Sequence, residues 1–345
     1  MKIVYLASEV FPFFKTGGLA DVMYALPKKM SELGHNVTVI MPKYDKIPLK
    51  YLEKLEWLAR LESHGEIFNL VKYPDKNINF YFIENRMLYE RGRVYGDNDE
   101  DIQYAMFSEI ALRFLKEINL KADILHCNDW QTAPIPYFLN VRYKSDHFYS
   151  NMKTIYTIHN LMYQGRFSKY SFERMGYSPT GYNLNFMEIG IKYANIVNTV
   201  SPTYANEIKF PYFSEGLEQI TNSRNIYGVL NGIDTDYFNP ETNKDIIPYN
   251  KNRLEYKKEN KYRLQEKLGL PKSDDMLITM VTRLVEGKGL DLVSYVIENI
   301  LKYDKIQMAI LGSGDKLYED YYNYLSKEFP DKFKVHTGYN PTLAN

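Results

Sequence analysis

The sequence predicts an α/β protein with two doubly wound parallel sheets, each in a domain of its own. Apolar runs of about five residues alternate with longer segments whose apolar residues recur at helical spacing, which is typical of β-α-β units. This alternation stops once, in a polar stretch rich in Pro and Asn, and then starts again. The chain has 345 residues, a length that suits two domains.

The first β-α-β unit lies at the N-terminus. Residues 2–8 form a β-branched run without helical period and predict a strand. Residues 19–33 have helical spacing, with Gly34 in the position of a C-terminal cap, and residues 36–41 predict a second strand. Because parallel strands need a crossover connection of this kind, the two strands are expected to be parallel neighbours.

The same pattern continues along the chain. Further strands are expected at residues 80–84, 124–127, 154–159, 196–200 and 227–230, with helices at 101–117 and 184–194. Residues 237–252 predict a linker, and a charged helix is expected at 253–268. Strands at 276–282, 305–311 and 333–336 then alternate with helices at 289–301 and 316–328. We therefore expect a first domain at 1–245 and a shorter second domain at 246–345.

The overall composition excludes several classes of protein. The 43 Lys and Arg residues balance 43 Asp and Glu residues, so the chain lacks the basic excess of a nucleic-acid binder. No stretch reaches the roughly 20 apolar residues that a membrane helix needs. The single cysteine, Cys127, cannot form a disulfide within the chain, and we expect a cytoplasmic protein. The 32 tyrosines fit either half-buried packing positions or a carbohydrate-binding surface.

A glycine-containing loop follows the first predicted strand. It includes Lys15, Gly17 and Gly18 and leads directly into the first predicted helix. Glycines let the backbone approach a ligand closely, and a helix N-terminus offers free N–H groups to an anion. The loop therefore fits a phosphate, although a simple tight turn has the same pattern. It matches neither a Walker loop nor a dinucleotide fingerprint, which disfavours a nicotinamide-dependent oxidoreductase.

Polar residues follow two of the later strands. His126 and Asp129 lie at the end of one predicted strand, and His159 and Asn160 lie at the end of the next. Ligands of open parallel sheets bind beyond the C-terminal ends of the strands, so these residues are candidates for a site. Packed and hydrogen-bonded structural histidines are the alternative.

The second domain offers two cations after its first strand. Arg283 and Lys288 fit an anionic leaving group stabilised by side chains alone, or an ordinary solvent-exposed surface. Gly312 follows the next strand in a Gly-Ser-Gly sequence. The sequence contains no paired-cysteine or His-Glu-x-x-His spacing for a metal and no Gly-x-Ser-x-Gly nucleophile elbow.

Six stretches in this order resemble the bacterial glycogen synthases and plant starch synthases, the ADP-glucose-dependent α-glucan synthases of the GT-B fold. They are residues 15–22, 126–133, 157–165, 193–208, 231–234 and 283–290. The resemblance runs over essentially the whole chain. It implies two Rossmann-like domains that face a cleft, and the transfer of glucose from ADP-glucose to the non-reducing end of an α-1,4-glucan such as glycogen, with retention. Neither a metal nor another cofactor is expected.

The resemblance also implies roles for individual residues. Lys15, Arg283 and Lys288 are expected to act on the donor diphosphate, and His159 is expected close to the reacting carbon. The other expected substrate-binding residues are Glu9, Gly17, Gly18, Asp21, Tyr95, Asp129, Asn160, Asn231 and Gly312.

The sequence departs from the family at its C-terminus. In the family the second domain continues beyond the point that corresponds to Asn345 and carries a Glu-Pro-Cys-Gly-Leu segment that contacts the donor sugar. We therefore expect an incomplete second domain. The alternative to an active synthase is a catalytically impaired chain that binds α-glucan through its first domain.

Overall fold

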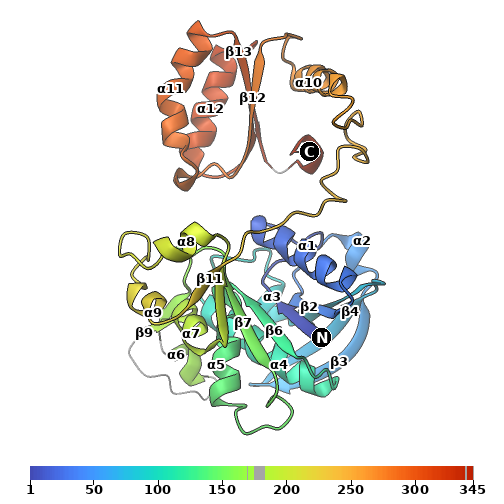
Figure 1. The fold of residues 1–345 in the computed structure, drawn as a ribbon, viewed down its shortest axis with the longest axis vertical. Helices are drawn as coiled ribbons and strands as arrows, with labels where there is room; N and C mark the ends of the chain where they lie inside the picture. The colour runs from blue at the N-terminus through green and yellow to red at the C-terminus, as the bar shows by residue number, and fades with distance from the viewer. Residues whose placement is uncertain (169, 175–182, 339, 345) are drawn as a thin grey trace. The chain divides into compact units, whose positions relative to one another are not determined.

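The computed structural model describes residues 1–168, 170–174, 183–338 and 340–344. The chain divides into an N-terminal unit, Met1–Asp234, and a C-terminal unit, Thr235–Asn345 (Figure 1). The boundary expected near residue 245 lies inside the C-terminal unit. Within the described ranges, every helix is too short or too polar to cross a membrane.

A nine-stranded sheet, counted over the described residues, forms the centre of the N-terminal unit. Its order is β11-β10-β7-β6-β1-β2-β5-β4-β3, and all neighbours from β11 to β5 are parallel. The strands are β1 (Lys2–Leu6), β2 (Asn36–Pro42), β3 (Glu56–Ser63), β4 (Glu66–Tyr73), β5 (Ile78–Glu84), β6 (Ile124–Asn128), β7 (Lys153–Ile158), β10 (Ile196–Thr199) and β11 (Ile226–Gly228).

The order of the strands reverses between β1 and β6. From β1 the chain runs through α1 (Gly18–Glu32) to β2 and later β5 on one side, and it then returns to β6 on the other side of β1. Leu6 of β1 is in register with Ile40 of β2 and with Cys127 of β6. Successive connections that leave in opposite directions open a crevice at the C-terminal ends of the strands, which is where open α/β sheets bind ligands.

Helices cover the large sheet on both faces, as Figure 1 shows. Among them, α4 (Glu100–Glu117) is buried along most of its length and is part of the core that also contains Val4 and Leu6 of β1. The remaining helices of this unit are α2 (Leu49–Leu52), α3 (Arg86–Tyr89), η1 (Trp130–Thr132), α5 (Pro134–Val141), α6 (Tyr170–Arg174), α7 (Phe186–Tyr193), α8 (Pro202–Glu207) and α9 (Glu218–Asn222).

The structure adds strands that the sequence analysis did not expect. Strands β3 and β4 form an antiparallel hairpin at the edge of the sheet, and β8 (Arg166–Ser168) pairs with β9 (Asn183–Asn185). The expected helix at 184–194 therefore begins later. The side chain of Asn185 accepts a hydrogen bond from the amide of Glu188 and so forms the N-terminal cap of α7 at Phe186.

The C-terminal unit has a smaller sheet of three parallel strands, again counted over the described residues. The strands β12 (Met276–Val281), β13 (Ile306–Gly312) and β14 (Phe333–Thr337) lie in chain order. In Figure 1, α11 (Leu290–Tyr303) and α12 (Lys316–Glu328) lie on one side of this sheet, and α10 (Glu255–Leu268) lies on the other. The short η2 (Glu286–Lys288) and α13 (Pro341–Ala344) complete the unit.

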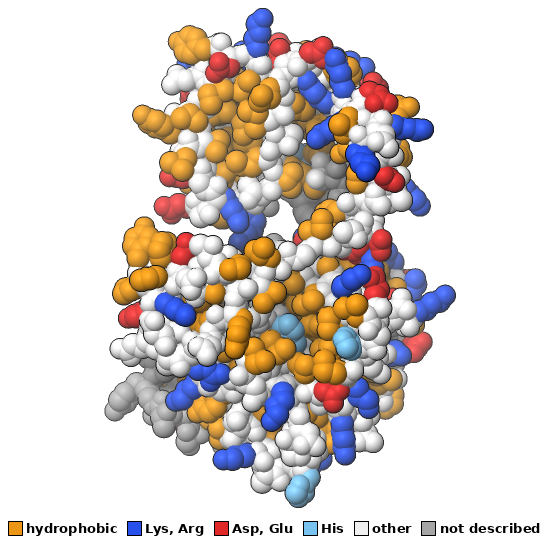
Figure 2. Space-filling model, viewed as in Figure 1, with side chains coloured by type: hydrophobic (Ala, Val, Ile, Leu, Met, Phe, Trp, Pro, Cys, Tyr) orange, Lys and Arg blue, Asp and Glu red, His pale blue; other side chains and the backbone are white. Residues whose placement is uncertain are grey.

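The two units differ in the size of their cores. The buried cluster of the C-terminal unit is small and centres on Leu290, Ile297, Ile310 and Phe333. Several large apolar side chains of this unit are exposed, including Met276 at 66% and Tyr295 at 87%. Figure 2 shows hydrophobic side chains grouped over the strands and helices of this unit on the face in view. Buried apolar area is the main source of folding stability. We therefore expect the C-terminal unit to be less stable than the N-terminal unit.

Candidate functional site

Three of the predicted residues meet at the C-terminal ends of β6 and β7. The Asp129 carboxylate oxygen Oδ1 accepts hydrogen bonds from the backbone amides of His159, at 2.8 Å, and Asn160, at 3.3 Å. The His159 Nε2 atom lies 3.0 Å from Oδ1 of the buried Asn128. The two strand ends are thus held together by side-chain contacts, with His159 in a fixed orientation. These three residues follow the C-terminal ends of β6 and β7, close to the point where the strand order reverses.

Asp129 adopts an unusual backbone conformation, with a φ of 55°. A positive φ in a residue other than glycine costs free energy, and such residues are often found at functional sites. Burial raises the pKa of the Asp129 carboxyl, while His159 and the two amide hydrogen bonds oppose that rise. With this backbone conformation, the Asp129 carboxylate faces the amides of the loop that follows β7.

The two histidines differ in their surroundings. His126 is buried, its Nε2 atom lies 2.7 Å from the Thr157 hydroxyl, and its ring packs at 4.9 Å from that of Tyr5. Burial lowers the pKa of His126 to about 3. His126 is therefore a packed and hydrogen-bonded structural histidine, the alternative to a site residue. Burial also lowers the pKa of His159, partly offset by Asp129, so a neutral imidazole is favoured at the site.

Glu9 follows β1 and lies against the N-terminal end of α1. Its Oε2 atom accepts hydrogen bonds from the Thr16 amide, at 2.7 Å, and the Thr16 hydroxyl, at 2.6 Å. Burial raises the pKa of Glu9, and hydrogen bonds from the backbone of Thr16, Gly17 and Ala20 lower it. The carboxylate thus takes the position at this helix end that the sequence analysis assigned to a phosphate.

Lys15, in the loop before α1, forms an ion pair with Asp21 in the first turn of α1. The Lys15 Nζ atom lies 2.7 Å and 2.6 Å from the two carboxylate oxygens of Asp21. Neither Gly17 nor Gly18 has a positive φ, and a Cβ atom at Gly18 would meet no atom within 4 Å. The fold itself therefore does not require glycine at Gly18.

Tyr95 lies beside Glu9 and Asp129. Its hydroxyl donates a hydrogen bond of 2.9 Å to Oγ of Ser8. Burial raises the pKa of Tyr95, and the nearby carboxylates of Glu9 and Asp129 add to the effect. The structure therefore brings together five predicted residues near the C-terminal ends of the central strands of the large sheet. They are Glu9, Tyr95, Asp129, His159 and Asn160.

Asn231 is exposed beyond the end of β11, near the end of the N-terminal unit. Three residues later, Asp234 forms an ion pair of 2.8 Å with Lys28 of α1. This ion pair links the segment that contains Asn231 to α1.

The predicted donor residues of the C-terminal unit lie on two connected loops. Arg283 follows β12, and the next residue, Leu284, donates a hydrogen bond of 2.9 Å from its amide to the Ser313 carbonyl after β13. A Cβ atom at Gly312 would lie 1.8 Å from the Thr282 carbonyl oxygen, so the close approach of the loops requires glycine there. Arg283 and Lys288 are both exposed. Within this unit, Arg283 and Gly312 therefore both lie at the C-terminal ends of strands of the small sheet.

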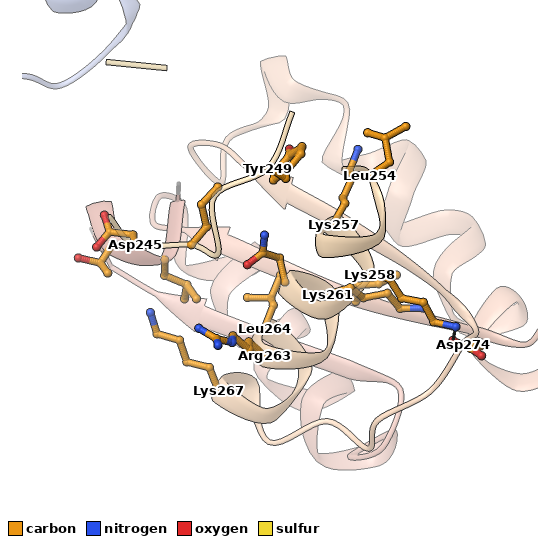
Figure 3. Close-up of a pocket in the computed structure, with 15 residues that line it drawn as sticks. Asp245, Tyr249, Leu254, Lys257, Lys258, Lys261, Arg263, Leu264, Lys267 and Asp274 are labelled. Carbon is orange, nitrogen blue, oxygen red and sulfur yellow. Dashed lines mark ion pairs between the residues drawn. The ribbon is translucent and has the colours of Figure 1, made fainter. Parts of the chain in front are cut away.

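A pocket of about 770 Å³ lies elsewhere in the C-terminal unit, beside α10 (Figure 3). Figure 3 shows Lys257, Lys261 and Lys267 of α10 around it. The pocket does not include Arg283, Lys288 or Gly312. Among the described residues, no group of three or more His, Cys, Asp or Glu side chains is placed to hold a metal ion.

Sequence reasoning missed the residues that support the site. Asn128 orients His159, Ser8 accepts from Tyr95, and Thr16 holds Glu9. Each lies next to or close to a predicted residue in the chain. Their roles follow from side-chain directions that a one-dimensional pattern does not contain.

A large parallel sheet with a polar cluster where its strand order reverses, followed by a second parallel α/β unit, is the architecture of the GT-B glycosyltransferases. The profile described as "Starch synthase catalytic domain" matches residues 2–223. Glycogen synthases of Clostridium novyi (strain NT) and Bacillus subtilis (strain 168) are 40% and 38% identical to the chain, over all of it and over 76% and 75% of their own lengths. The catalytic domain of starch synthase IV from Arabidopsis thaliana, bound to ADP and acarbose, is 31% identical with a TM-score of 0.92, over 99% of this chain and 75% of that one.

The chain therefore belongs to the glycogen synthase and starch synthase family. The family and the α/β fold class expected from the sequence are confirmed. The chain spans about three quarters of the length of these relatives. The roles of individual residues stay predictions.

Proposed function

We propose that this protein transfers glucose from ADP-glucose to the 4-hydroxyl group at the non-reducing end of an α-1,4-glucan, with retention of the anomeric configuration. The observation that carries this proposal is the cluster of Glu9, Tyr95, Asp129, His159 and Asn160 at the β1–β6 switch point. The names of the relatives, and the ADP bound to the starch synthase IV domain, support a glucosyl donor with an ADP leaving group.

The reaction builds up opposite charges on the leaving diphosphate and on the transferred sugar. The bond between glucose C1 and the phosphate oxygen of ADP breaks, and C1 forms a bond to the acceptor oxygen, whose proton leaves on the ADP phosphate. Negative charge grows on the diphosphate, and we assign its stabilisation to Lys15, Arg283 and Lys288. Positive charge grows on the sugar ring, which favours a neutral His159 over a charged imidazolium beside it.

Asp129 acts as a positioning residue in this proposal. Its bonds to the amides of His159 and Asn160 fix the loop that we assign to the transferred glucose. We also propose that the reaction needs no metal ion, because the cations assigned to the diphosphate are side chains. A cytoplasmic location, supported by the single cysteine, is part of the same proposal.

The test is the incorporation of radiolabelled glucose from ADP-glucose into glycogen by the purified 345-residue chain. We expect incorporation that persists in EDTA and is lost from the glycogen after digestion with β-amylase, which removes α-1,4-linked units from non-reducing ends. Product analysis by NMR reports the anomeric configuration of the new linkage. Absence of incorporation from ADP-glucose contradicts the proposal.

A chain that binds α-glucan without transferring glucose is the second candidate. It is favoured by one observation, namely that the polar cluster around Asp129 lies wholly within the N-terminal unit. Retardation in a gel that contains glycogen, together with no incorporation of glucose, would identify this case.

A further inference from the structure

The side chain of Asn128 is a buried amide that contacts three separate segments of the N-terminal unit. Asn128 is the last residue of β6 and is fully buried. Its Nδ2 atom donates hydrogen bonds to the Leu6 carbonyl of β1, at 3.1 Å, and to the His126 carbonyl of β6, at 3.0 Å. Its Oδ1 atom lies 3.0 Å from Nε2 of His159, in the loop after β7. Both ends of the amide therefore have defined partners.

These partners determine which way the amide faces. The two ends of an asparagine amide have nearly the same size, and the hydrogen-bond network decides which of them is the nitrogen. The carbonyl oxygens of Leu6 and His126 only accept hydrogen bonds, so the atom that faces them has to be the amide nitrogen. The reverse orientation would bury an oxygen against two carbonyl oxygens with no hydrogen between them. Oδ1 of Asn128 therefore faces His159.

The position of Asn128 is fixed by its backbone as well. Its amide donates a hydrogen bond of 2.6 Å to Oγ1 of Thr132, and its carbonyl accepts one of 2.9 Å from the same hydroxyl group. Asn128 is also in register with Thr157 of the neighbouring β7. The acceptor that faces His159 is thus held in place by the sheet and by η1.

This acceptor determines which nitrogen of His159 carries the proton. Oδ1 of an asparagine has no hydrogen, so in the 3.0 Å contact the Nε2 atom of His159 has to donate. A neutral imidazole has a single N–H group, so its Nδ1 atom then carries none. Within the described part of the chain, Nδ1 of His159 has no hydrogen-bond partner. Its lone pair is therefore available to a ligand.

We infer that Asn128 is a positioning residue that holds His159 as the neutral tautomer with its proton on Nε2 and with Nδ1 unprotonated. The tautomer follows from contacts within the N-terminal unit alone. Its use in the reaction rests on the proposed function. A substrate group in contact with Nδ1 has to supply the hydrogen of that bond, as a hydroxyl group does, and the ring adds no positive charge beside the transferred sugar.

Two titratable groups beside His159 bear on its charge. Burial lowers the pKa of His159, and the Asp129 carboxylate, from the loop after β6, opposes that shift. The imidazole of His126, on β6, is itself neutral at pH 7, because burial lowers its pKa to about 3. Asn128 accepts the Nε2 proton without a negative charge that would stabilise an imidazolium. A neutral amide at this position therefore keeps the ring neutral while it fixes the tautomer.

The first test is ¹⁵N NMR of the 345-residue chain, labelled at its six histidines and free of substrate. Protonated and unprotonated nitrogens of a neutral imidazole give well-separated signals, and the signals of His159 are those that disappear in His159→Gln. At pH 7 we expect a protonated Nε2 and an unprotonated Nδ1. A proton on Nδ1, or signals averaged between the two tautomers, overturns the inference.

The second test removes the acceptor. Asn128→Leu has a side chain of similar size without Oδ1, so the preference for a proton on Nε2 weakens. We expect the two nitrogen signals of His159 to move toward each other as the tautomers exchange. Under the proposed function, kcat with ADP-glucose is expected to fall about tenfold, the effect of losing one hydrogen bond. Unchanged nitrogen signals of His159 in this variant would contradict a role for Asn128.

Asn85→Leu is the matched control. Asn85 is 3% exposed, donates a hydrogen bond of 3.0 Å to the Ile67 carbonyl and accepts one of 2.9 Å from the Leu88 amide. The control therefore removes another buried and fully bonded asparagine and is expected to leave the signals of His159 unchanged. Altered signals of His159 in this control would show that they respond to a general loss of stability, which would contradict a specific role for Asn128.

The NMR measurement separates this inference from the proposed function, because it needs no substrate. A proton on Nε2 of His159 in a chain that transfers no glucose from ADP-glucose would support the tautomer and contradict the proposed function. Glucose transfer by a chain in which Nδ1 carries the proton would contradict the tautomer and leave the proposed function standing.

Discussion

At the scale of single residues, the charged groups of the α1 loop are already paired within the N-terminal unit. Lys15 contacts Asp21, and Glu9 accepts hydrogen bonds at the start of α1. In the proposed function, a diphosphate that binds to Lys15 either displaces Asp21 or shares the ammonium group with it, since a lysine has three N–H donors. The role of Asp21 in binding the substrate stays a prediction.

Removal of the proposed cations is expected to slow the reaction. Lys15→Ala and Arg283→Ala should each lower kcat by about two orders of magnitude, since each removes a charge that stabilises the leaving diphosphate. Steady-state kinetics with ADP-glucose and glycogen measure the effect. Lys29→Ala is the matched control, because Lys29 lies exposed on α1 and pairs only locally with Glu32 at 2.9 Å. Wild-type rates in both variants would remove Lys15 and Arg283 from the donor site.

The buried His126 should make folding stability depend on pH. Its folded-state pKa of about 3 lies below the ordinary value near 6.5, so the unfolded chain binds the proton first as the pH falls. The contribution of His126 is fully present above pH 6.5 and is lost by up to about 1.4 kcal/mol per pH unit below it. Urea denaturation at pH 7 and pH 5 measures this slope.

His126→Asn should show a smaller loss of stability between these two pH values than the wild type. The exposed His147 provides the comparison, and His147→Asn should keep the wild-type slope. A slope unaffected by His126→Asn would show that this imidazole does not control the pH response.

The individual site residues could be predicted as far as strand ends could be located. Asp129 and His159 were found because each directly follows a buried strand, and the structure brings them together. Asn128 was not found, because its contact with His159 depends on the direction of a side chain. Strand ends alone did not distinguish His126 from His159, and the family resemblance assigned a role only to His159. In the structure His126 is buried and packs against Tyr5.

At the scale of elements, the loop 162–166 depends on Gly165. Replacement by Ala forces a side chain into the indole of Trp130 and also strains the positive φ. Gly34→Ala pays the same kind of backbone strain, with a φ of 85°, but meets no atom within 4 Å. We expect Gly34→Ala to cost about 1 kcal/mol and Gly165→Ala at least about 2 kcal/mol more. The free energy of unfolding in urea measures this difference. Equal losses of stability in the two variants would show that the loop rearranges to accommodate the new side chain at little cost.

The elements that the sequence predicted are those with strong periodicity. The expected helix at 101–117 corresponds to α4 (Glu100–Glu117), and the expected strand at 124–127 corresponds to β6 (Ile124–Asn128). The β3–β4 hairpin was missed because its residues are largely exposed on β3, so that no continuous apolar run marks it. An antiparallel edge needs only one apolar face, and such strands give a weaker signal.

At the scale of the whole molecule, the family, the fold class and a second domain with a smaller core were within reach of the sequence, while the particular residues that fill each core were not. The core cluster of the N-terminal unit draws on residues from β1 to β11, whereas that of the C-terminal unit centres on a few side chains around β13. Periodicity predicts which residues face inward, but not how many layers of neighbours cover them.

This inequality offers a calorimetric signature. A scanning experiment should resolve two heat-absorption peaks, with the C-terminal unit melting first. A ligand raises the melting temperature of the unit that binds it. Maltotetraose, a short α-1,4-glucan, should therefore shift only the later peak, which belongs to the N-terminal unit. A single peak that moves as a whole would mean that the two bodies melt together. Thermograms thus assign each substrate to one of the two units.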